Sequence, residues 1–422
     1  MFNSTRAKII GFLLGFVVVA GICFAGGFAG GILYDQQVLQ ADTQKVSVPA
    51  GATQDFQLMV DAWNTIEKNY VDRSAINNTQ LRYGAISGMV DALGDTGHSR
   101  FLSPQAVKSE NSYTSGQFEG IGAEVQTKDG QTVIVAPIPG SPAEKAGVQS
   151  GDIITKVDGT DVSGLPLETV VGKILGPAGT QVEITLENPN TKQSRTLTIT
   201  RARISIQNVV WSMVPGTTIA DVQVAGFSSG VTGKLRDALT AAQAQGATGV
   251  ILDLRNDPGG LLNESVGVAS QFLKSGVVLQ EKDAQGKVNN INVQPGGAAT
   301  DIPLIVLINQ GTASASEIVA GALQDAQRAT LIGETTFGTG TVLDTFSLPD
   351  NSALLLATRE WLTPKGRVIW HKGIAPDQTI TPPAGAAPLY AYQLKSMSAA
   401  DVTATQDTQF QQALKTLQPA SK

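Results

Sequence analysis

The segment from Pro303 to Asp325 constrains the fold most strongly, because it reads as an apolar strand, a tight turn and a helix with Ser314 in its first turn. A serine there lies where free helix N–H groups and the positive end of the helix dipole face a ligand. Enzymes that cleave acyl bonds need this arrangement, since the attacking oxygen and the oxyanion donors must converge on one carbonyl. A core helix with a Ser/Thr-rich N-cap explains the same residues. The segment alone leaves both interpretations open.

The composition narrows the classes of protein to which the chain can belong. A chain of 422 residues with 42% hydrophobic residues predicts two or three globular domains with a substantial core. A net charge of −6 and the lack of a basic stripe argue against a nucleic-acid partner. The chain has one cysteine, Cys23, and two histidines, His98 and His371, which argues against an internal disulfide and a zinc centre. We expect no metal and no other cofactor.

The N-terminus has the pattern of a membrane anchor. Arg6 and Lys8 precede an uncharged run, Ile9–Tyr34, that is long enough to cross a bilayer. Positive charge on this side predicts a cytoplasmic N-terminus and an exported body, in the periplasm or at the cell exterior. We expect residues 1–35 to be an uncleaved signal-anchor; a cleaved signal peptide is the alternative. Small residues spaced four apart in this run give weak support for a homo-oligomer.

Changes in composition divide the rest of the chain into five parts. A polar linker, residues 36–53, leads to residues 54–117, where apolar residues at steps of three and four predict amphipathic helices. Short strands and turn signals fill residues 118–203. Strands alternate with helices in residues 204–382, which predicts functional loops at the carboxyl ends of strands. Residues 383–422 form an Ala/Pro-rich and then Gln/Thr-rich C-terminal tail, to which we assign no function.

The strand-rich part carries a recognisable series of glycine motifs. In order, these are Gly120-Ile-Gly-Ala123, Pro139-Gly-Ser-Pro-Ala-Glu-Lys-Ala-Gly147 and Gly151-Asp-Ile-Ile-Thr-Lys-Val-Asp-Gly159. The series closely resembles a circularly permuted PDZ domain of bacterial exported proteases. The resemblance implies that the N–H groups of Gly120, Ile121, Gly122 and Ala123 hold the C-terminal carboxylate of a peptide. The peptide would add a strand beside Ala123–Thr127, in contact with Val125.

The part that alternates strands and helices carries four further motifs. They are Leu252-Asp-Leu-Arg-Asn-Asp-Pro-Gly-Gly260, Thr312-Ala-Ser-Ala-Ser-Glu317, Gly333-Glu-Thr-Thr-Phe-Gly-Thr-Gly340 and Leu362-Thr-Pro-Lys-Gly-Arg367 followed by Lys372-Gly-Ile-Ala-Pro-Asp377. No GK[ST] follows the glycine pair at 259–260, so a phosphate loop fits it less well than an oxyanion site. In this order the motifs resemble the carboxyl-terminal processing (tail-specific) serine peptidases of bacteria and plastids. The similarity covers roughly Phe56 to Thr381.

The resemblance implies an α+β multidomain fold. After the membrane helix it comprises a small helical unit, a PDZ β-domain and an α/β peptidase core of the ClpP/crotonase-like type. It also implies that Ser314 is the nucleophile and that Gly260 and Ala315 supply the backbone oxyanion donors. The PDZ domain would capture protein or peptide substrates by their free C-termini and gate the active site.

The sequence departs from the family at the general base. The family motif is Phe-Gly-Lys-Gly-Thr-Val-Gln, in which the lysine is the base and the glutamine supports it. Here Thr339 and Leu343 replace these two residues. A threonine hydroxyl has no useful pKa near neutrality and cannot take the proton of Ser314. The protein is therefore an inactive relative that binds peptides, an enzyme with another base, or one that uses a lysine such as Lys365 or Lys372.

His98 is the substitute base of most interest. Distant relatives, the tricorn-type peptidases, resemble Ser-His-acid enzymes whose histidine comes from an upstream segment, and His98 lies in such a segment, Gly94-Asp-Thr-Gly-His-Ser. Histidine is the natural base at neutral pH. However, relatives with a lysine base also carry a histidine near this place. His371 fits the role less well, Lys372 matches a lysine common in the family, and Glu317 fits a structural role better than a catalytic one.

The leading interpretation is an extracytoplasmic serine endopeptidase that is anchored in the membrane and acts near protein C-termini. The alternative is a catalytically inactive PDZ-bearing binding or scaffold protein on the same fold.

Overall fold

The computed structural model describes residues 51–418 except 96–98, 129, 139 and 190. The apolar run Ile9–Tyr34 lies outside these residues, as does most of the expected linker. No helix within the described ranges is long and apolar enough to cross a membrane. The chain divides into two compact units, Met1–Leu81 and Arg82–Lys422.

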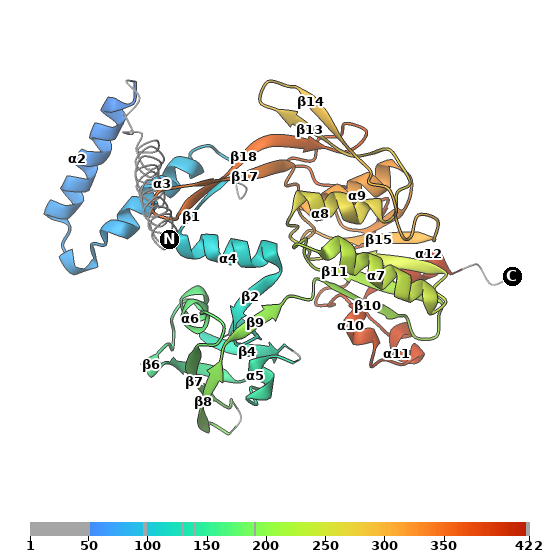
Figure 1. Cartoon of the computed structure of the whole chain (residues 1–422), viewed down its shortest axis with the longest axis horizontal. Coiled ribbons are helices and arrows are strands. Elements are labelled where there is room, and N and C mark those ends of the chain that lie inside the picture. The colour runs from blue at the N-terminus through green and yellow to red at the C-terminus, as the bar shows by residue number, and fades with distance from the viewer. Residues whose placement is uncertain (1–50, 96–98, 129, 139, 190, 419–422) are drawn as a thin grey trace, which may run out of the picture. The chain divides into compact units, whose positions relative to one another are not determined.

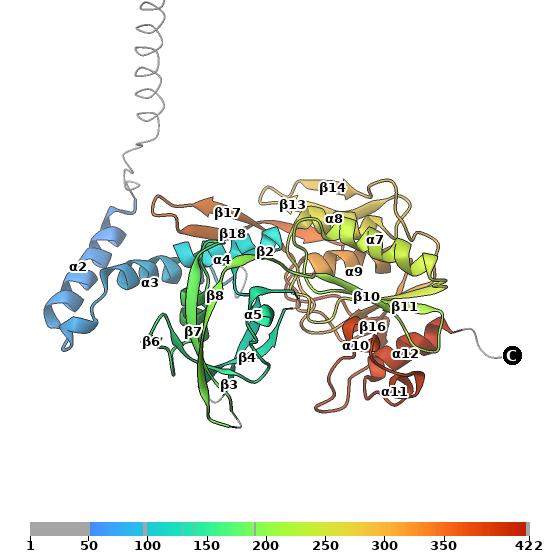
Figure 2. The same cartoon turned by 60° about the horizontal axis from the view of Figure 1, so that its bottom comes forward.

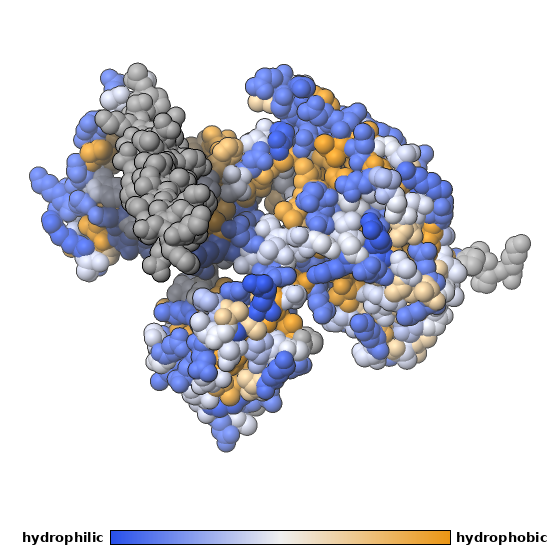
Figure 3. Space-filling view, in the orientation of Figure 1, coloured by the Kyte–Doolittle hydropathy of each residue, from blue (hydrophilic) through white to orange (hydrophobic). Residues whose placement is uncertain are grey.

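The first unit contains the predicted amphipathic helix α2, Thr53–Asn69, and the short 3-10 turn η1, Arg73–Ala75. None of the residues of α2 is buried. Phe56, Met59 and Ile66 of its apolar stripe are exposed, and hydrophobic side chains stand among hydrophilic ones on this helix in Figure 3. The predicted periodicity is therefore present, but none of the apolar side chains of this stripe is fully buried among the described residues.

The second unit begins within α3, Asn78–Asp91, and continues through β1, Arg100–Leu102, to α4, Pro104–Ser115. Ser103 caps α4 and Pro104 opens it, while Gly116 at φ +68° ends it, the usual signals for each position. At this end the Ser229 N–H donates to the Thr114 carbonyl at 2.8 Å. The end of α4 is thus joined to the segment directly before α7 (Val231–Ala244).

The strand-rich part that is expected to be a PDZ domain is a small β-barrel-like unit with its own core (Figure 1). A two-stranded ribbon of β2 and β9 leads into and out of a sheet of order β3-β4-β5-β7-β8, and β6 pairs with β5. Arg201 ties the helix α6 to this sheet through bonds to the carbonyls of Ile174 and Gln181 at 2.7 and 2.8 Å. The elements are β2 (Gln117–Gly120), β3 (Ala123–Lys128), β4 (Gln131–Pro137), α5 (Pro142–Lys145), β5 (Ile153–Val157), β6 (Thr160–Asp161), α6 (Leu167–Ile174), β7 (Gln181–Glu187), β8 (Ser194–Thr200) and β9 (Ala202–Ser205).

A six-stranded sheet of order β10-β11-β12-β15-β16-β19 forms the centre of the remaining part. β10 is antiparallel to β11, and all later pairs are parallel. Parallel neighbours need crossover connections, which the helices provide, so the predicted alternation of strands and helices is confirmed. The strands are β10 (Val209–Met213), β11 (Ile219–Val224), β12 (Gly249–Asp253), β15 (Leu304–Ile308), β16 (Thr330–Gly333) and β19 (Gln378–Thr379).

Helices cover both faces of this sheet (Figure 2). Alternate side chains of the strands, such as Val250 and Leu252, face a core with α7 (Val231–Ala244), α8 (Leu262–Ser270) and α9 (Ala315–Asp325). The intervening residues, such as Ile251, face α10 (Ala391–Leu394), α11 (Ala399–Thr403) and α12 (Thr408–Leu417). Strands that are buried on both faces have continuous apolar sequences, and β12 and β15 have such sequences.

The C-terminal residues form a layer of the core. Phe410 is fully buried, and Arg255 at the end of β12 donates to Asp253 at 2.6 Å and to Asp407 at 2.7 Å with 1% of its side chain exposed. Asp221 adjoins this cluster, and burial together with Asp253 raises its pKa well above the ordinary range. The core therefore extends beyond residue 382, where the composition changes.

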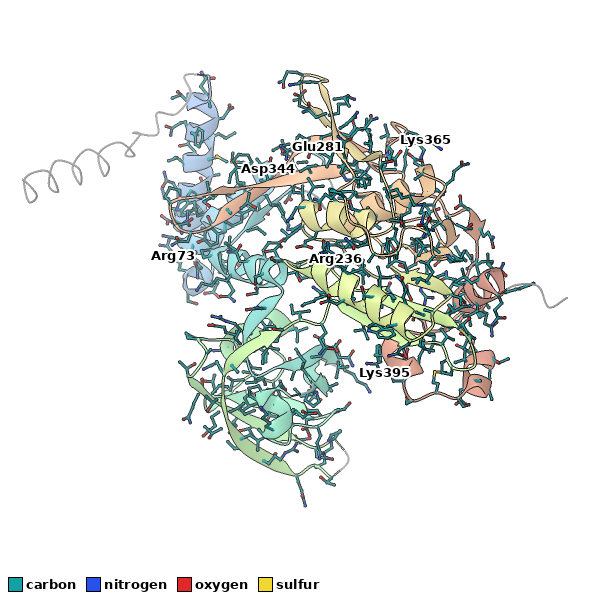
Figure 4. All side chains as sticks on the ribbon, turned by 45° about the vertical axis from the view of Figure 1, so that its right-hand side comes forward. Arg73, Arg236, Glu281, Asp344, Lys365 and Lys395 are labelled. Carbon is teal, nitrogen blue, oxygen red and sulfur yellow. The ribbon has the colours of Figure 1, made fainter. Side chains whose placement is uncertain are left out.

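A second, antiparallel sheet flanks the core. The hairpin of β17 (Thr341–Ser347) and β18 (Ala353–Leu362) pairs with β13 (Val277–Asp283), which pairs with β14 (Val288–Asn292), and β1 also pairs with β18. Glu281 and Asp344, labelled in Figure 4, lie 3.6 and 3.4 Å from Arg359, so ion pairs join β13 and β17 to β18. β17, which begins at Thr341, directly follows the motif that contains Thr339.

Candidate active site

Ser314 lies at the N-terminus of α9, in the strand–turn–helix that the sequence predicts. β15 ends at Ile308, and Ser314 precedes the first residue of the helix. Its backbone has φ +56° and ψ −117°, a conformation that costs an L-residue about 1–3 kcal/mol. Within the described part of the chain, the Ser314 hydroxyl makes no hydrogen bond to cap the helix. A strained turn that leaves the serine only half-buried is the geometry of a nucleophile that a substrate can reach.

The glycine pair at 259–260 packs directly against this serine. A Cβ atom on Gly259 would lie 2.7 Å from Ser314 Cβ and 2.8 Å from the Ala315 nitrogen. Gly259 has φ +97° and Gly260 has φ +142°, so a side chain at either place would be strained as well as crowded. The absence of a side chain at Gly259 therefore permits the close approach of this loop to Ser314, and at Gly260 a Cβ would instead lie 2.6 Å from the Phe227 carbonyl oxygen.

Two backbone donors beside Ser314 remain unused. No hydrogen bond within the described residues engages the N–H of Gly260 or of Ala315. Ala315 opens α9, where helix N–H groups have no partner within the helix. Ala315 is buried and Gly260 is half-buried, and backbone N–H groups in such places are normally paired. Two unpaired donors here indicate a place for an anionic oxygen.

The carboxylate of Glu317 joins the nucleophile to the loop where the family lysine would lie. It is fully buried and accepts from the Ser314 N–H at 2.9 Å and the Thr339 N–H at 2.9 Å. Its other oxygen accepts from the Thr336 hydroxyl at 2.5 Å and the Gly338 N–H at 2.8 Å. Four donors engage this carboxylate, which fits the structural role expected of it.

The two candidate lysines, Lys365 and Lys372, lie at different distances from the site. The Lys365 N–H donates to Asp325 at the far end of α9, and eleven helical residues from Ser314 correspond to about 16 Å. Lys365 is also exposed at the edge of the core (Figure 4). The backbone of Lys372, in contrast, lies against Gly338, where a Cβ would be 3.0 Å from the Lys372 nitrogen. The neighbouring His371 is exposed and its N–H donates to the Gly338 carbonyl at 2.9 Å.

His98 lies outside the described residues, and its neighbour Ser99 gives the nearest observation. The Ser99 hydroxyl accepts from the Ala357 N–H on β18 at 2.9 Å. Four residues later on the same strand, the Trp361 N–H donates to the Gly340 carbonyl at 3.0 Å. Ser99 is thus anchored about 13 Å along β18 from the loop that contains Thr339.

Two groups near the glycine pair were not predicted from the sequence. Asp257 is fully buried, its Oδ1 accepts from the Gly259 N–H at 2.8 Å, and its Oδ2 has no partner among the described residues. Burial raises the pKa of Asp257 well above the ordinary range, although the bond from Gly259 opposes the shift. Tyr113 donates its hydroxyl to the Gly259 carbonyl at 2.8 Å. No motif signals Tyr113, because it lies 146 residues before the glycine it contacts.

The glycine loop of the strand-rich domain opens onto a groove of about 970 Å³ between α4, β3 and α6. Ile121, Gly122, Ala123 and Val125 line this groove. Gly120 is buried at the end of β2, directly before them. Within the described chain, no hydrogen bond uses the N–H of Ile121 or Gly122, and β3 is an edge strand of its sheet. Free N–H groups at the head of an open strand are the features that bind an extended peptide by its carboxylate.

Comparisons with known proteins agree with these features. The model of peptidase family S41 matches residues 218–380, and the model of the PDZ domain matches residues 133–188. The carboxyl-terminal-processing protease of Synechocystis is 34% identical over 86% of this chain and 86% of its own length. The carboxy-terminal processing protease CtpA of Bacillus subtilis is 37% identical over 76% and 68%. A solved Bacteroides fragilis structure described as an S41 protease is 19% identical, covers 84% of this chain and 96% of its own, and has a TM-score of 0.51, which supports the fold.

Proposed function

The chain belongs to peptidase family S41, and from this premise we propose that it is a serine endopeptidase that cleaves proteins near their C-termini with Ser314 as the nucleophile. The observation that carries the proposal is the strained Ser314 at the start of α9, with the unused N–H groups of Gly260 and Ala315 beside it. A nucleophile and two oxyanion donors on one carbonyl are what acyl transfer requires.

The reaction follows from these positions. Ser314 Oγ attacks the scissile carbonyl carbon while a base accepts its proton, and the carbonyl oxygen becomes an anion held by the N–H groups of Gly260 and Ala315. The tetrahedral intermediate collapses, the amine leaves with the proton that the base returns, and an acyl-enzyme on Ser314 remains. Water then attacks the acyl-enzyme in the same way and releases the new C-terminus.

We propose His98 as the base. In support of this proposal, an imidazole titrates near neutrality, whereas Thr339 has no proton acceptor of suitable pKa and Lys365 lies at the far end of α9. Lys372, whose backbone lies against Gly338, is the competing base. A protein without any base would be the alternative peptide-binding scaffold.

We also propose how substrates reach the site. The loop Gly120–Ala123 would hold the free C-terminal carboxylate of a protein, and the chain behind it would pair with β3 along Val125. From the sequence, residues 1–35 would anchor the enzyme in the membrane as a single pass, with the catalytic part outside the cytoplasm. The glycine spacing in this anchor gives weak support for a homo-oligomer.

Kinetics of single and double variants test the chemistry. Ser314→Ala and His98→Ala should each abolish cleavage of a peptide substrate, and the double variant should be no worse, because members of one catalytic unit are not additive. Wild-type kcat/KM should fall below about pH 6.5 as the imidazole becomes protonated. The measurements are kcat and KM of the full chain between pH 5 and 9, with Lys365→Ala as a control that should retain activity.

The other outcomes each exclude one interpretation. Cleavage that survives His98→Ala but not Lys372→Ala would assign the base to the lysine. If the wild type shows no turnover while Thr339→Lys with Leu343→Gln restores it, the protein is a lapsed peptidase that binds peptides. Turnover that survives Ser314→Ala would reject the proposed nucleophile.

A further inference from the structure

The hydroxyl of Tyr113 has a fixed position beside the glycine pair. It donates to the Gly259 carbonyl at 2.8 Å from the last turn of α4. The bond from Ser229 N–H to Thr114 carbonyl, at 2.8 Å, holds this end of the helix. A Cβ on Gly226 would lie only 3.0 Å from the Tyr113 oxygen, so the glycine at this position leaves the space that the hydroxyl occupies.

The atom that Tyr113 contacts belongs to the peptide unit that carries the proposed oxyanion donor. The Gly259 carbonyl and the Gly260 N–H are the two ends of one trans peptide, so they point in opposite directions. The carbonyl accepts from Tyr113 and, at 2.8 Å, from the Phe227 N–H. Both lone pairs of the oxygen are then engaged, and the orientation of the peptide plane is fixed.

We propose that Tyr113 is a positioning residue for peptide hydrolysis, whose hydroxyl orients and polarises the Gly259–Gly260 peptide so that the Gly260 N–H meets the oxyanion. The inference rests on the proposed function, because it takes this N–H as an oxyanion donor. An amide whose carbonyl accepts a hydrogen bond is a stronger N–H donor, by about 10–30% per bond. Without Tyr113, the Phe227 N–H would be the only remaining donor to this carbonyl among the described residues.

Tyr113 keeps its proton under all conditions in which the enzyme would work. Burial raises the pKa of Tyr113 well above its ordinary value, and the nearby carboxylates of Asp257 and Glu110 raise it further. The hydroxyl therefore remains a donor at neutral and mildly alkaline pH. Removal of the Tyr113 hydroxyl should therefore lower the activity by the same factor at every pH where Ser314 is active, without adding a new pKa to the pH profile.

The variant Tyr113→Phe tests this role, because it keeps the ring and removes only the hydroxyl. Removing an oxyanion donor outright costs about 10²–10³ in kcat, and Tyr113 acts one peptide away, so we expect kcat to fall roughly 10- to 100-fold with KM within about twofold. A peptide aldehyde forms a hemiacetal with Ser314 that carries an oxyanion. Its affinity should fall by the same factor as kcat, which a merely structural role would not produce.

The matched control is Tyr83→Phe, which removes a hydroxyl that donates to Asp350 at 3.0 Å. This control should leave kcat and the aldehyde affinity unchanged. If the wild type turns over and Tyr113→Phe changes neither quantity, Tyr113 has no positioning role although the proposed function stands. A rise in KM with unchanged kcat would equally overturn the inference. A wild type without turnover or aldehyde adduct would overturn the proposed function itself.

Discussion

At the scale of single residues, Glu317 explains how the site keeps its shape without the family lysine. Its two carboxylate oxygens accept four hydrogen bonds, from Ser314, Thr336, Gly338 and Thr339. A carboxylate is the side chain that can accept at all of these places, since it has no donor to oppose them. The hydrogen bond to this carboxylate and the close contact with Gly259 together hold the backbone of Ser314 in its strained conformation.

The variant Glu317→Gln should therefore weaken the fold and the site together. In glutamine an NH₂ group replaces one of the two acceptor oxygens, and this NH₂ would face the N–H and O–H donors that now bind the oxygen. At least one buried hydrogen bond is lost, and two donors are brought into a repulsive contact. We expect a loss of about 1.5–3 kcal/mol in the free energy of unfolding, measured by denaturant titration, and a lower kcat. Glu334→Gln is the control, because the Glu334 carboxylate makes no hydrogen bond among those of the described residues. Wild-type stability of Glu317→Gln would contradict the structural role.

At the scale of elements, the sequence predicts those parts of the fold whose pattern is local. The apolar runs of β12 and β15 predict buried strands, and the glycine motifs predict the PDZ domain and the loop beside Ser314. Pairing between distant segments leaves no local pattern. The contact of Tyr113 with Gly259 and the layer formed by α10–α12 depend on side chains such as Phe410 that meet the sheet only in the folded chain.

The peptide-binding groove gives a prediction at this scale. A peptide with a free apolar C-terminus should bind the full-length Ser314→Ala chain more tightly than its C-terminal amide, by about 1.5–3 kcal/mol, since hydrogen bonds to a charged group are lost in the amide. Calorimetric titration of both peptides measures the difference. Gly122→Ala should remove the preference, because Gly122 has φ +78° and a Cβ there would lie 2.5 Å from Ser141 Cβ.

Gly130→Ala is the matched control for this experiment. Gly130 also has positive φ, +73°, but a Cβ there meets nothing within 4 Å. Strain from a left-handed backbone is thus common to both variants, and only Gly122→Ala disturbs the glycine loop. If the unaltered groove binds the free-acid peptide and its amide with equal affinity, the loop does not recognise the carboxylate of a substrate.

At the scale of the whole molecule, the topology of the chain decides which proteins the site can meet. The described residues contain no membrane-spanning helix, so the anchor rests on the sequence pattern alone: Arg6 and Lys8 before the apolar run Ile9–Tyr34. Cytoplasmic loops retain positive charge, and a span of this length crosses a bilayer. The body of the enzyme would then act only on exported proteins or on exported tails of membrane proteins.

Reporter fusions after Thr53 test this topology. An enzyme reporter that is active only outside the cytoplasm should be active, and a reporter that needs the cytoplasm should be silent, because the positive side of the span stays inside. An uncleaved anchor further predicts that the fusion keeps its full length and stays in the membrane fraction after alkaline extraction. Replacing Arg6 and Lys8 by glutamine and Asp35 by lysine reverses the charge bias and should increase the fraction with the cytoplasmic reporter active. A cytoplasmic reporter that is active in the unaltered chain would place the catalytic part inside the cell and overturn the proposed localisation.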